Sequence, residues 1–197
     1  MEKIYILDTN VLIQAPYAVE CFEENEVVLP MTVLEELDNL KKEEGEKGAN
    51  VRRVIRILDA YREKGNLLEG VYTGHGGILR VEKNYLNVEL PEDLPDHKSD
   101  NRILKVCIGL SKESPKQVIL VTKDILLRIK AQILGIQAED FTTEQVAGHE
   151  EQYLGRKEVF VPEVLFKDFK KKGVPVESVY CCDSNGTCIH PELFENE

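Results

Sequence analysis

The chain has 197 residues, of which 42% are apolar, and a formal net charge of −11 at pH 7. The apolar content is sufficient for a packed core and excludes disorder as the expected state of the whole chain. The acidic surplus weighs against broad, non-specific binding of nucleic acid, which depends on Lys and Arg, unless the acids are clustered to hold cations.

The cysteine content and the lack of a long apolar run predict a cytoplasmic protein without a membrane partner. The chain has five cysteines, an odd number, and Cys21 and Cys107 lie within apolar segments, which is typical of a reducing compartment. No run approaches the length of a membrane-spanning helix, and no secretory leader is visible at the N-terminus.

The first half of the sequence alternates short apolar strands with helices. Residues 4–7 (IYIL) and 26–30 (EVVLP) are typical of buried strands. A helix with one apolar face is predicted from Thr32, followed by a break in the charged, glycine-containing stretch 41–48. A second and stronger amphipathic helix is predicted over residues 49–64.

The next part of the sequence continues the alternation. Residues 71–90 predict a hairpin or short extended pieces, and a polar, proline-rich loop leads to a helix that begins near Asp100. Residues 117–122 form an almost wholly apolar strand, as expected in a parallel sheet covered on both faces, and a helix follows at 125–134. This order predicts an α/β domain with a mainly parallel sheet.

After about residue 150 the sequence changes in character. A strand is predicted at 155–162, a short basic helix or turn at 163–173, and a hairpin at 178–191 with SNG at its tip. We therefore expect a main domain at 1–148 and a small β-rich extension at 149–197.

The cysteines of the extension raise two alternatives. Cys181, Cys182, Cys188 and His190 are possible zinc ligands, but adjacent cysteines point to opposite faces of a strand and lack the usual spacing. A disulfide from Cys188 to Cys181 or Cys182 is also possible in principle, although a reducing compartment disfavours it. The hairpin interpretation is preferred to both.

Acidic residues stand where a site would form. Asp8 follows the strand at 4–7, and Asp124 follows the strand at 117–122. In an open parallel sheet, ligands bind at this carboxyl edge. Asp100 lies in the first turn of its helix, where the helix dipole favours a carboxylate, and it leans toward the packed face.

A fourth carboxylate is expected from the helix that begins at Thr32. Glu36 lies about 90° from the centre of its apolar face, whereas Glu35 lies about 170° away, in solvent. A side chain that reaches into a cleft should stand at the border of the buried face, so Glu36 is the candidate.

Each acid also has a purely structural interpretation. Asp8 and Asp124 could cap helices, Asp100 could complement a helix dipole, and Glu36 could be a solvated surface charge. As a set, however, four converging carboxylates repel one another and raise each other's pKa, and a hard divalent cation removes that cost. Oxygen ligands with retained water suit Mg²⁺ or Mn²⁺.

The motifs around these acids resemble a known family. YILDTNVLI, LPMTVLEELD, KSDNRILKVC and ILVTKDILLRIKAQILGI resemble, in order and spacing, the four acidic motifs of PIN-domain ribonucleases, over roughly residues 1–145. GANVRRVIRILD, GHGGILRVE and LGRKEVFVPEVLFKDFKKKGV resemble the N-terminal PIN half of PhoH-like proteins, in which an ATPase domain follows. This sequence has no G-x-x-x-x-G-K-[ST] motif, so an excised domain and a stand-alone version both stay open.

The resemblance implies a three-layer α/β/α fold and a metal-dependent ribonuclease that uses Mg²⁺ or Mn²⁺ to hydrolyse single-stranded RNA. It also implies a homo-oligomer and an attached PhoH-type ATPase domain in the full-length protein. The implied catalytic and metal-binding set is Asp8, Glu36, Asp100 and Asp124. Candidate substrate contacts, each of which could instead be structural or surface groups, are Thr9, Asn10, Thr122, Lys123, Arg128, Arg52 and Arg53.

Two other functions are left open. The domain could be a weak or inactive nuclease that binds RNA or drives oligomerisation for an attached ATPase. A phosphatase or phosphotransferase of the haloacid dehalogenase kind also begins with a strand-end Asp nucleophile. That chemistry needs a second Asp two residues later, where this sequence has Asn10.

Overall fold

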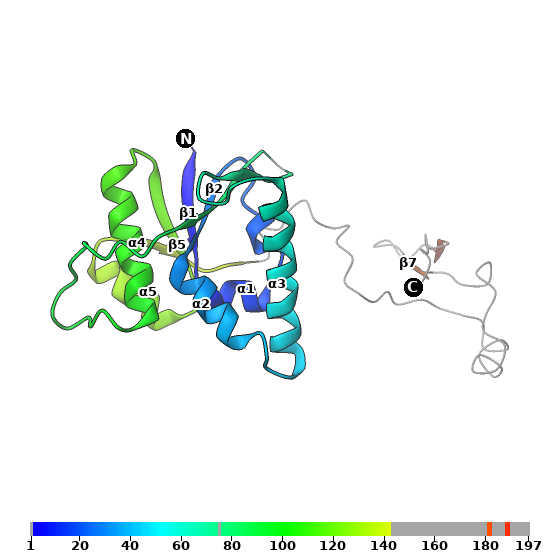
Figure 1. Ribbon diagram of the computed structural model, residues 1–197, viewed down its shortest axis with the longest axis horizontal. Helices are drawn as coiled ribbons and strands as arrows, with labels where there is room; N and C mark the ends of the chain where they lie inside the picture. Colours follow the sequence, from blue (N-terminus) through cyan, green and yellow to red (C-terminus); the bar gives the residue numbers. More distant parts are fainter. Residues whose placement is uncertain (1, 75, 143–180, 183–187, 190–197) are drawn as a thin grey trace. The chain divides into compact units, whose positions relative to one another are not determined.

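The computed structural model describes residues 2–74 and 76–142, together with the residue pairs 181–182 and 188–189. The chain divides into two units, Met1–Ala147 and Gly148–Glu197. The described residues of the first unit contain a central sheet and the helices that cover it (Figure 1).

Six strands form the central sheet. Their bounds are β1 Lys3–Leu7, β2 Glu26–Pro30, β3 Val71–Tyr72, β4 Ile78–Glu82, β5 Gln117–Val121 and β6 Gln137–Glu139. The spatial order is β3-β4-β2-β1-β5-β6, and every neighbouring pair is parallel except β3 with β4. The three predicted strands at 4–7, 26–30 and 117–122 are thus the adjacent strands β1, β2 and β5.

Helices pack on both faces of the sheet, which gives the three-layer α/β/α arrangement expected from the sequence (Figure 1). They are α1 Thr9–Gln14, α2 Met31–Leu40, α3 Gly45–Lys64, α4 Ser99–Glu113 and α5 Ile125–Ile133, with a short 3₁₀ helix η1 at Ala18–Glu20. The core lies between these layers, and central strand residues such as Ile6, Leu7 and Leu120 are fully buried. Within the described residues, no helix combines the length and apolar character needed to cross a membrane.

The pairing of β1 with β5 fixes the edge at which the site forms. The register places Ile6 opposite Leu120 and Leu7 opposite Val121, over more than a hundred residues of sequence. Asp8 and Thr122 therefore leave the sheet side by side. Because residues 4–7 and 118–121 are apolar and buried, a shifted register would bring the polar residues that flank them into the core.

The structure corrects one expected boundary. Helix α3 begins at Gly45 rather than at residue 49, and Gly48 lies near its start rather than in a break between helices. Gly48 is buried, and a Cβ atom there would lie 1.8 Å from the backbone oxygen of Glu43. Glycine is needed at this position because the preceding turn packs against it, not because the helix stops.

Three short elements were not predicted. Helix α1 has six residues, and η1 and β6 have three each, which is too short for a helical or alternating pattern to be recognised. The hairpin expected over 71–90 is present as β3 and β4, but β4 also pairs with β2 and so extends the central sheet.

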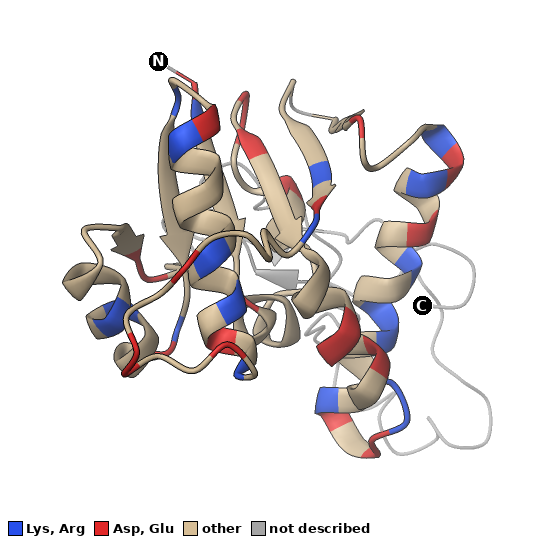
Figure 2. Ribbon diagram, turned by 60° about the vertical axis from the view of Figure 1, so that its left-hand side comes forward, with Lys and Arg blue, Asp and Glu red and all other residues tan. Residues whose placement is uncertain are grey.

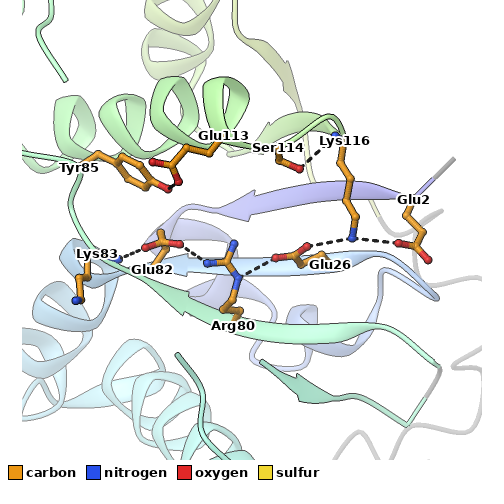
Figure 3. Close-up of polar contacts among 9 residues, drawn as sticks. All are labelled: Glu2, Glu26, Arg80, Glu82, Lys83, Tyr85, Glu113, Ser114 and Lys116. Carbon is orange, nitrogen blue, oxygen red and sulfur yellow. Dashed lines mark hydrogen bonds and ion pairs between the residues drawn. The ribbon is translucent and has the colours of Figure 1, made fainter. Parts of the chain in front are cut away.

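A chain of ion pairs links strands β2 and β4 at their polar positions. Arg80 of β4 donates to Glu26 of β2 at 2.8 Å and also contacts Glu82, and these three side chains are at most 18% exposed (Figure 3). Lys116 extends the chain from Glu26, at 3.3 Å, to Glu2, at 3.0 Å. The Arg80–Glu26 contact crosses from β4 to β2, and the opposite charges compensate one another in a mostly buried position.

Little of the predicted extension falls within the described residues. Its strands β7 Cys181–Cys182 and β8 Cys188–Ile189 pair antiparallel, with Cys182 opposite Cys188, as the expected hairpin requires. The strand predicted at 155–162, the basic helix at 163–173, His190 and the SNG tip lie outside the described residues. The boundary at residue 148 stays a prediction.

Candidate functional site

A polar pocket of about 240 Å³ lies at the carboxyl edge of the sheet. It lies where α1 leaves β1, beside the C-terminal half of α2 and the start of α4. Its lining residues are Asp8, Thr9, Asn10, Ile13, Glu36, Asn39, Leu40, Lys47 and Asp100. Three of the four acids expected from the sequence thus share one pocket.

Asp8 is the buried member of this set, with 4% of its surface exposed. Its backbone N–H donates to the Val121 carbonyl at 3.0 Å, which extends the β1–β5 pairing by one residue. Its Oδ2 accepts hydrogen bonds from Thr122 Oγ1 at 2.7 Å and from Asn10 Nδ2 at 3.4 Å. Although Asp8 occupies the N-cap position of α1, its side chain makes no capping hydrogen bond. The Asp8 carboxylate therefore lines the pocket and does not cap the helix.

The surroundings of Asp8 raise its pKa. Burial is the main cause, because it disfavours the charged form, and the carboxylates of Glu36 and Asp100 add to the rise. Hydrogen bonds from Thr122 and the Thr9 backbone act in the opposite direction. The net rise in the pKa means that a charged Asp8 in this position lowers the stability of the folded chain.

Thr122 connects the two strand-end acids. This fully buried side chain donates from Oγ1 to Asp8 and accepts, at 3.0 Å, the backbone N–H of Asp124. The hydroxyl hydrogen must then point at Asp8, because the lone pair faces Asp124. Thr122 therefore orients the Asp8 carboxylate, which is the structural alternative to its predicted contact with substrate.

Glu36 lies on the pocket side of α2 and accepts a hydrogen bond from Thr9 Oγ1. Its neighbour Glu35 is exposed and pairs with Arg102 at 3.5 Å, outside the pocket. The helical-face argument therefore places Glu36 where the structure has it.

Asp100 enters the pocket from the first turn of α4. Its Oδ2 accepts a hydrogen bond from Lys130 Nζ of α5 at 2.9 Å. The pair is partly exposed, and it gives Asp100 a cationic partner that the sequence reasoning did not foresee.

Asp124 does not line the pocket, in contrast to the other three acids. Its Oδ1 accepts the backbone N–H groups of Leu126, at 2.7 Å, and Leu127, at 3.4 Å, and so caps α5. The capping interpretation of Asp124 thus describes its geometry. Because both cap bonds go to Oδ1, Oδ2 is available to another partner.

Three of the four basic residues expected to contact substrate already have protein partners. Lys123 and Arg128 lie 3.6 and 3.7 Å from the carboxylate of Asp140. Arg52 Nη1 donates to two backbone carbonyls of the turn before α3, and Arg53 is exposed on the same helix. In the view of Figure 2, basic and acidic positions are interleaved along the helices rather than separated into one basic helix.

Three polar residues at or beside the pocket were missed by the sequence reasoning. Asn39 stands three residues after Glu36 on α2, so helical spacing could have identified it. Lys47 lies in the stretch that was predicted as a break between helices. Lys130 lies on a different helix from Asp100, so no spacing rule relates the two.

The donor chemistry of the pocket fits a hard divalent cation, because its charged groups are mainly carboxylates. Asp8, Glu36 and Asp100 are the residues that could hold it. As they stand in the described part of the chain, no three His, Cys, Asp or Glu side chains are grouped closely enough to bind a metal ion. Each of the three pocket acids instead bonds to an internal donor: a threonine for Asp8 and Glu36, and a lysine for Asp100.

The solved structures that this chain matches include a domain of a functionally unknown protein from Methanocaldococcus jannaschii DSM 2661. It has a TM-score of 0.47 and 20% identity, over 77% of this chain and 97% of that one. The structure of VapBC-1 from nontypeable Haemophilus influenzae has a TM-score of 0.36 and 16% identity, over 70% of this chain and 97% of that one.

Curated relatives share much more of the sequence. Protein PhoH2 of Bacillus subtilis (strain 168) is 46% identical over 178 residues, which cover 87% of this chain and 40% of that protein. Protein PhoH2 of Mycolicibacterium smegmatis is 40% identical over 147 residues, which cover 73% of this chain and 33% of that protein. This chain therefore matches less than half the length of either relative.

The sequence profile of the PIN domain family matches residues 5–142. The match extends from within β1 to beyond β6 and includes all four acids and Thr122. It confirms the resemblance inferred from the acidic motifs, and the chain belongs to the PIN domain family.

Proposed function

We propose that this chain is a divalent-metal-dependent ribonuclease domain that hydrolyses phosphodiester bonds in single-stranded RNA. PIN domains are generally nucleases and typically use divalent metal ions. The observation that carries the proposal is the convergence of Asp8, Glu36 and Asp100 on one pocket, with the pKa of Asp8 raised by burial and by the other two acids. Carboxylates that destabilise one another in a pocket are typical of a functional site.

In this proposal Asp8, Glu36 and Asp100 hold Mg²⁺ or Mn²⁺, and Asp124 completes the acidic set through its Oδ2. The bound cation would supply Lewis-acid activation of the phosphate and a water of lowered pKa. Thr122 keeps the Asp8 carboxylate in one orientation, and Thr9 does the same for Glu36. A fixed carboxylate reduces the reorganisation that cation binding requires.

The pocket is also lined by polar side chains and by one positively charged residue, Lys47, which could face a substrate. Asn39 lines it and is available to RNA phosphates, in addition to the predicted contacts Asn10 and Arg53. Lys47, in contrast, lines it but pairs with Glu43 at 3.1 Å. Lys123, Arg128 and Arg52 would first have to leave the partners described above. The assignment of single-stranded RNA comes from the family resemblance.

The PhoH2 relatives are more than twice as long as the part that this chain matches. We propose that the domain acts in cis with a PhoH-type ATPase domain in a full-length protein, and that it forms a homo-oligomer. The ATPase would deliver single-stranded RNA to the pocket.

A second candidate function is an RNA-binding or oligomerisation module with little catalysis. One observation favours it: the pocket acids have internal partners and, among the described residues, do not form a ready group of three metal ligands.

The two functions can be separated with labelled single-stranded RNA in the presence of Mn²⁺. We expect the wild-type chain to cleave the RNA, EDTA to abolish cleavage, and Asp8→Asn to reduce the rate at least a hundredfold. Glu35→Gln is the matched control, because Glu35 is a neighbouring carboxylate outside the pocket. This variant should cleave RNA at the wild-type rate. Equal cleavage by wild type and Asp8→Asn would exclude the proposed site, whereas Mn²⁺ binding without cleavage would favour the module.

A further inference from the structure

One acid of the candidate site, Asp100, is paired with a positively charged side chain, Lys130. Lys130 Nζ lies 2.9 Å from Asp100 Oδ2, and the two side chains are 26% and 37% exposed. The contact joins two helices, since Asp100 begins α4 and Lys130 lies in the last turn of α5. It therefore depends on the tertiary fold and not on local helical spacing.

Lys130 differs from the other cations near the pocket. Lys47 lines the pocket but pairs with Glu43, which is not a pocket residue, at 3.1 Å. Lys123 and Arg128 pair with Asp140. Among the ion pairs of the described residues, Lys130 alone places a positive charge on one of the pocket acids.

A divalent cation held by Asp100 would lie close to the Lys130 ammonium group, because both would interact with the same carboxylate. A cation bound to Asp100 would repel the Lys130 charge, and because the two side chains are only partly exposed, water screens this repulsion only in part. Cation binding must therefore break the ion pair or be weakened by it.

We propose that Lys130 is an intramolecular competitor for the metal site, a positioning residue that neutralises Asp100 in the metal-free chain and is displaced when a divalent cation binds. In the metal-free chain, the Lys130 charge reduces the repulsion between Asp100 and the other pocket acids. The same charge lowers the affinity of the site for the divalent cation. The inference rests on the proposed function, because it assumes that Asp100 is a ligand of a divalent cation.

The test is the affinity of the metal-free chain for Mn²⁺, measured by calorimetry without RNA. Removal of the competing charge in Lys130→Met should tighten Mn²⁺ binding about threefold to fivefold, which is the range expected for the loss of a partly exposed ion pair. Lys130→Arg keeps the charge and should bind like wild type. Lys112→Met removes the same charge from the far end of α4, where the side chain is exposed, and should also bind like wild type.

A second measurement uses only the wild-type chain and does not depend on the folding of a variant. Titration with diamagnetic Mg²⁺ should shift the Lys130 side-chain NMR signals, while those of Lys112 stay in place. Unchanged or weaker Mn²⁺ binding by Lys130→Met, or a Lys130 signal that Mg²⁺ does not move, would overturn the competitor role alone. If the wild type and all the variants fail to bind Mn²⁺, both the proposed metal site and the competitor role of Lys130 are excluded.

Discussion

Asp8 shows at the scale of one residue how the fold holds a carboxylate in surroundings that disfavour its charged form. The carboxylate is almost wholly buried and has two acidic neighbours, and its hydrogen bonds from Thr122 and the Thr9 backbone only partly offset the resulting rise in its pKa. The sequence could show that Asp8 follows a strand. It could not show that Asp8 makes no helix cap whereas Asp124 does, because Asp precedes a helix in both cases.

We expect Asp8→Asn to stabilise the metal-free chain at neutral pH. The folded pKa of Asp8 lies above the unfolded value of 3.8, so the folded chain binds more protons in this range and the free energy of unfolding falls as pH rises through it. Asparagine removes this loss, which amounts to about 1.4 kcal/mol per unit of pKa rise.

The measurement is thermal unfolding in EDTA at pH 7 and at a pH below that unfolded value. The Tm of Asp8→Asn should exceed that of wild type at pH 7, and the difference should shrink at acid pH, where Asp8 is protonated in both states. A gain of the same size at both pH values would show that the carboxylate charge is not its cause.

At the scale of elements, the sequence predicts well what is long and periodic. The buried strands β1, β2 and β5 and helices α2, α4 and α5 were all anticipated, because each has an apolar run or an apolar face of sufficient length. The predicted start of α3 was wrong because a glycine such as Gly48 can have two explanations, a helix break or a close backbone contact. Only the packed structure shows the turn at Glu43 against it.

The close contact at Gly48 makes a prediction about the α2–α3 connection. Gly48→Ala would place a Cβ atom 1.8 Å from a backbone oxygen, so the turn must shift, and overpacking of this kind costs about 1–3 kcal/mol. Denaturant unfolding should show the loss. Gly74→Ala is the control, since an added Cβ there meets nothing within 4 Å and Gly74 is exposed. Equal stability of the two variants would contradict the packing explanation, because alanine otherwise favours a helix over glycine.

At the scale of the whole molecule, the candidate site is assembled from segments that are far apart in sequence. The parallel order of β1 and β5 brings Asp8 to Thr122, and helices α2 and α4 add Glu36 and Asp100. The edge of the sheet could be predicted from the strand pattern alone. The internal partners of the acids could not, because a contact such as Asp100 with Lys130 depends on how two helices lie against the same sheet.

The proposed metal site predicts a stability that depends on the cation. A ligand that binds only the folded chain, at a hundred times its Kd, stabilises it by about 2.7 kcal/mol. For a chain of this size this corresponds to a rise in Tm of about 5–10 °C. Wild type should show this shift when Mn²⁺ replaces EDTA, and Asp8→Asn should lose most of it.

The two effects on Asp8→Asn have opposite signs, which separates them from general damage to the fold. The variant should be the more stable chain in EDTA and the less stable one in saturating Mn²⁺, so that the order of the two Tm values reverses. Buffer with NaCl at matched ionic strength controls for screening of the net charge of −11. An equal Mn²⁺ shift in both chains would mean that the cation binds elsewhere on the acidic surface, and that the Asp8 carboxylate at the end of β1 is not its ligand.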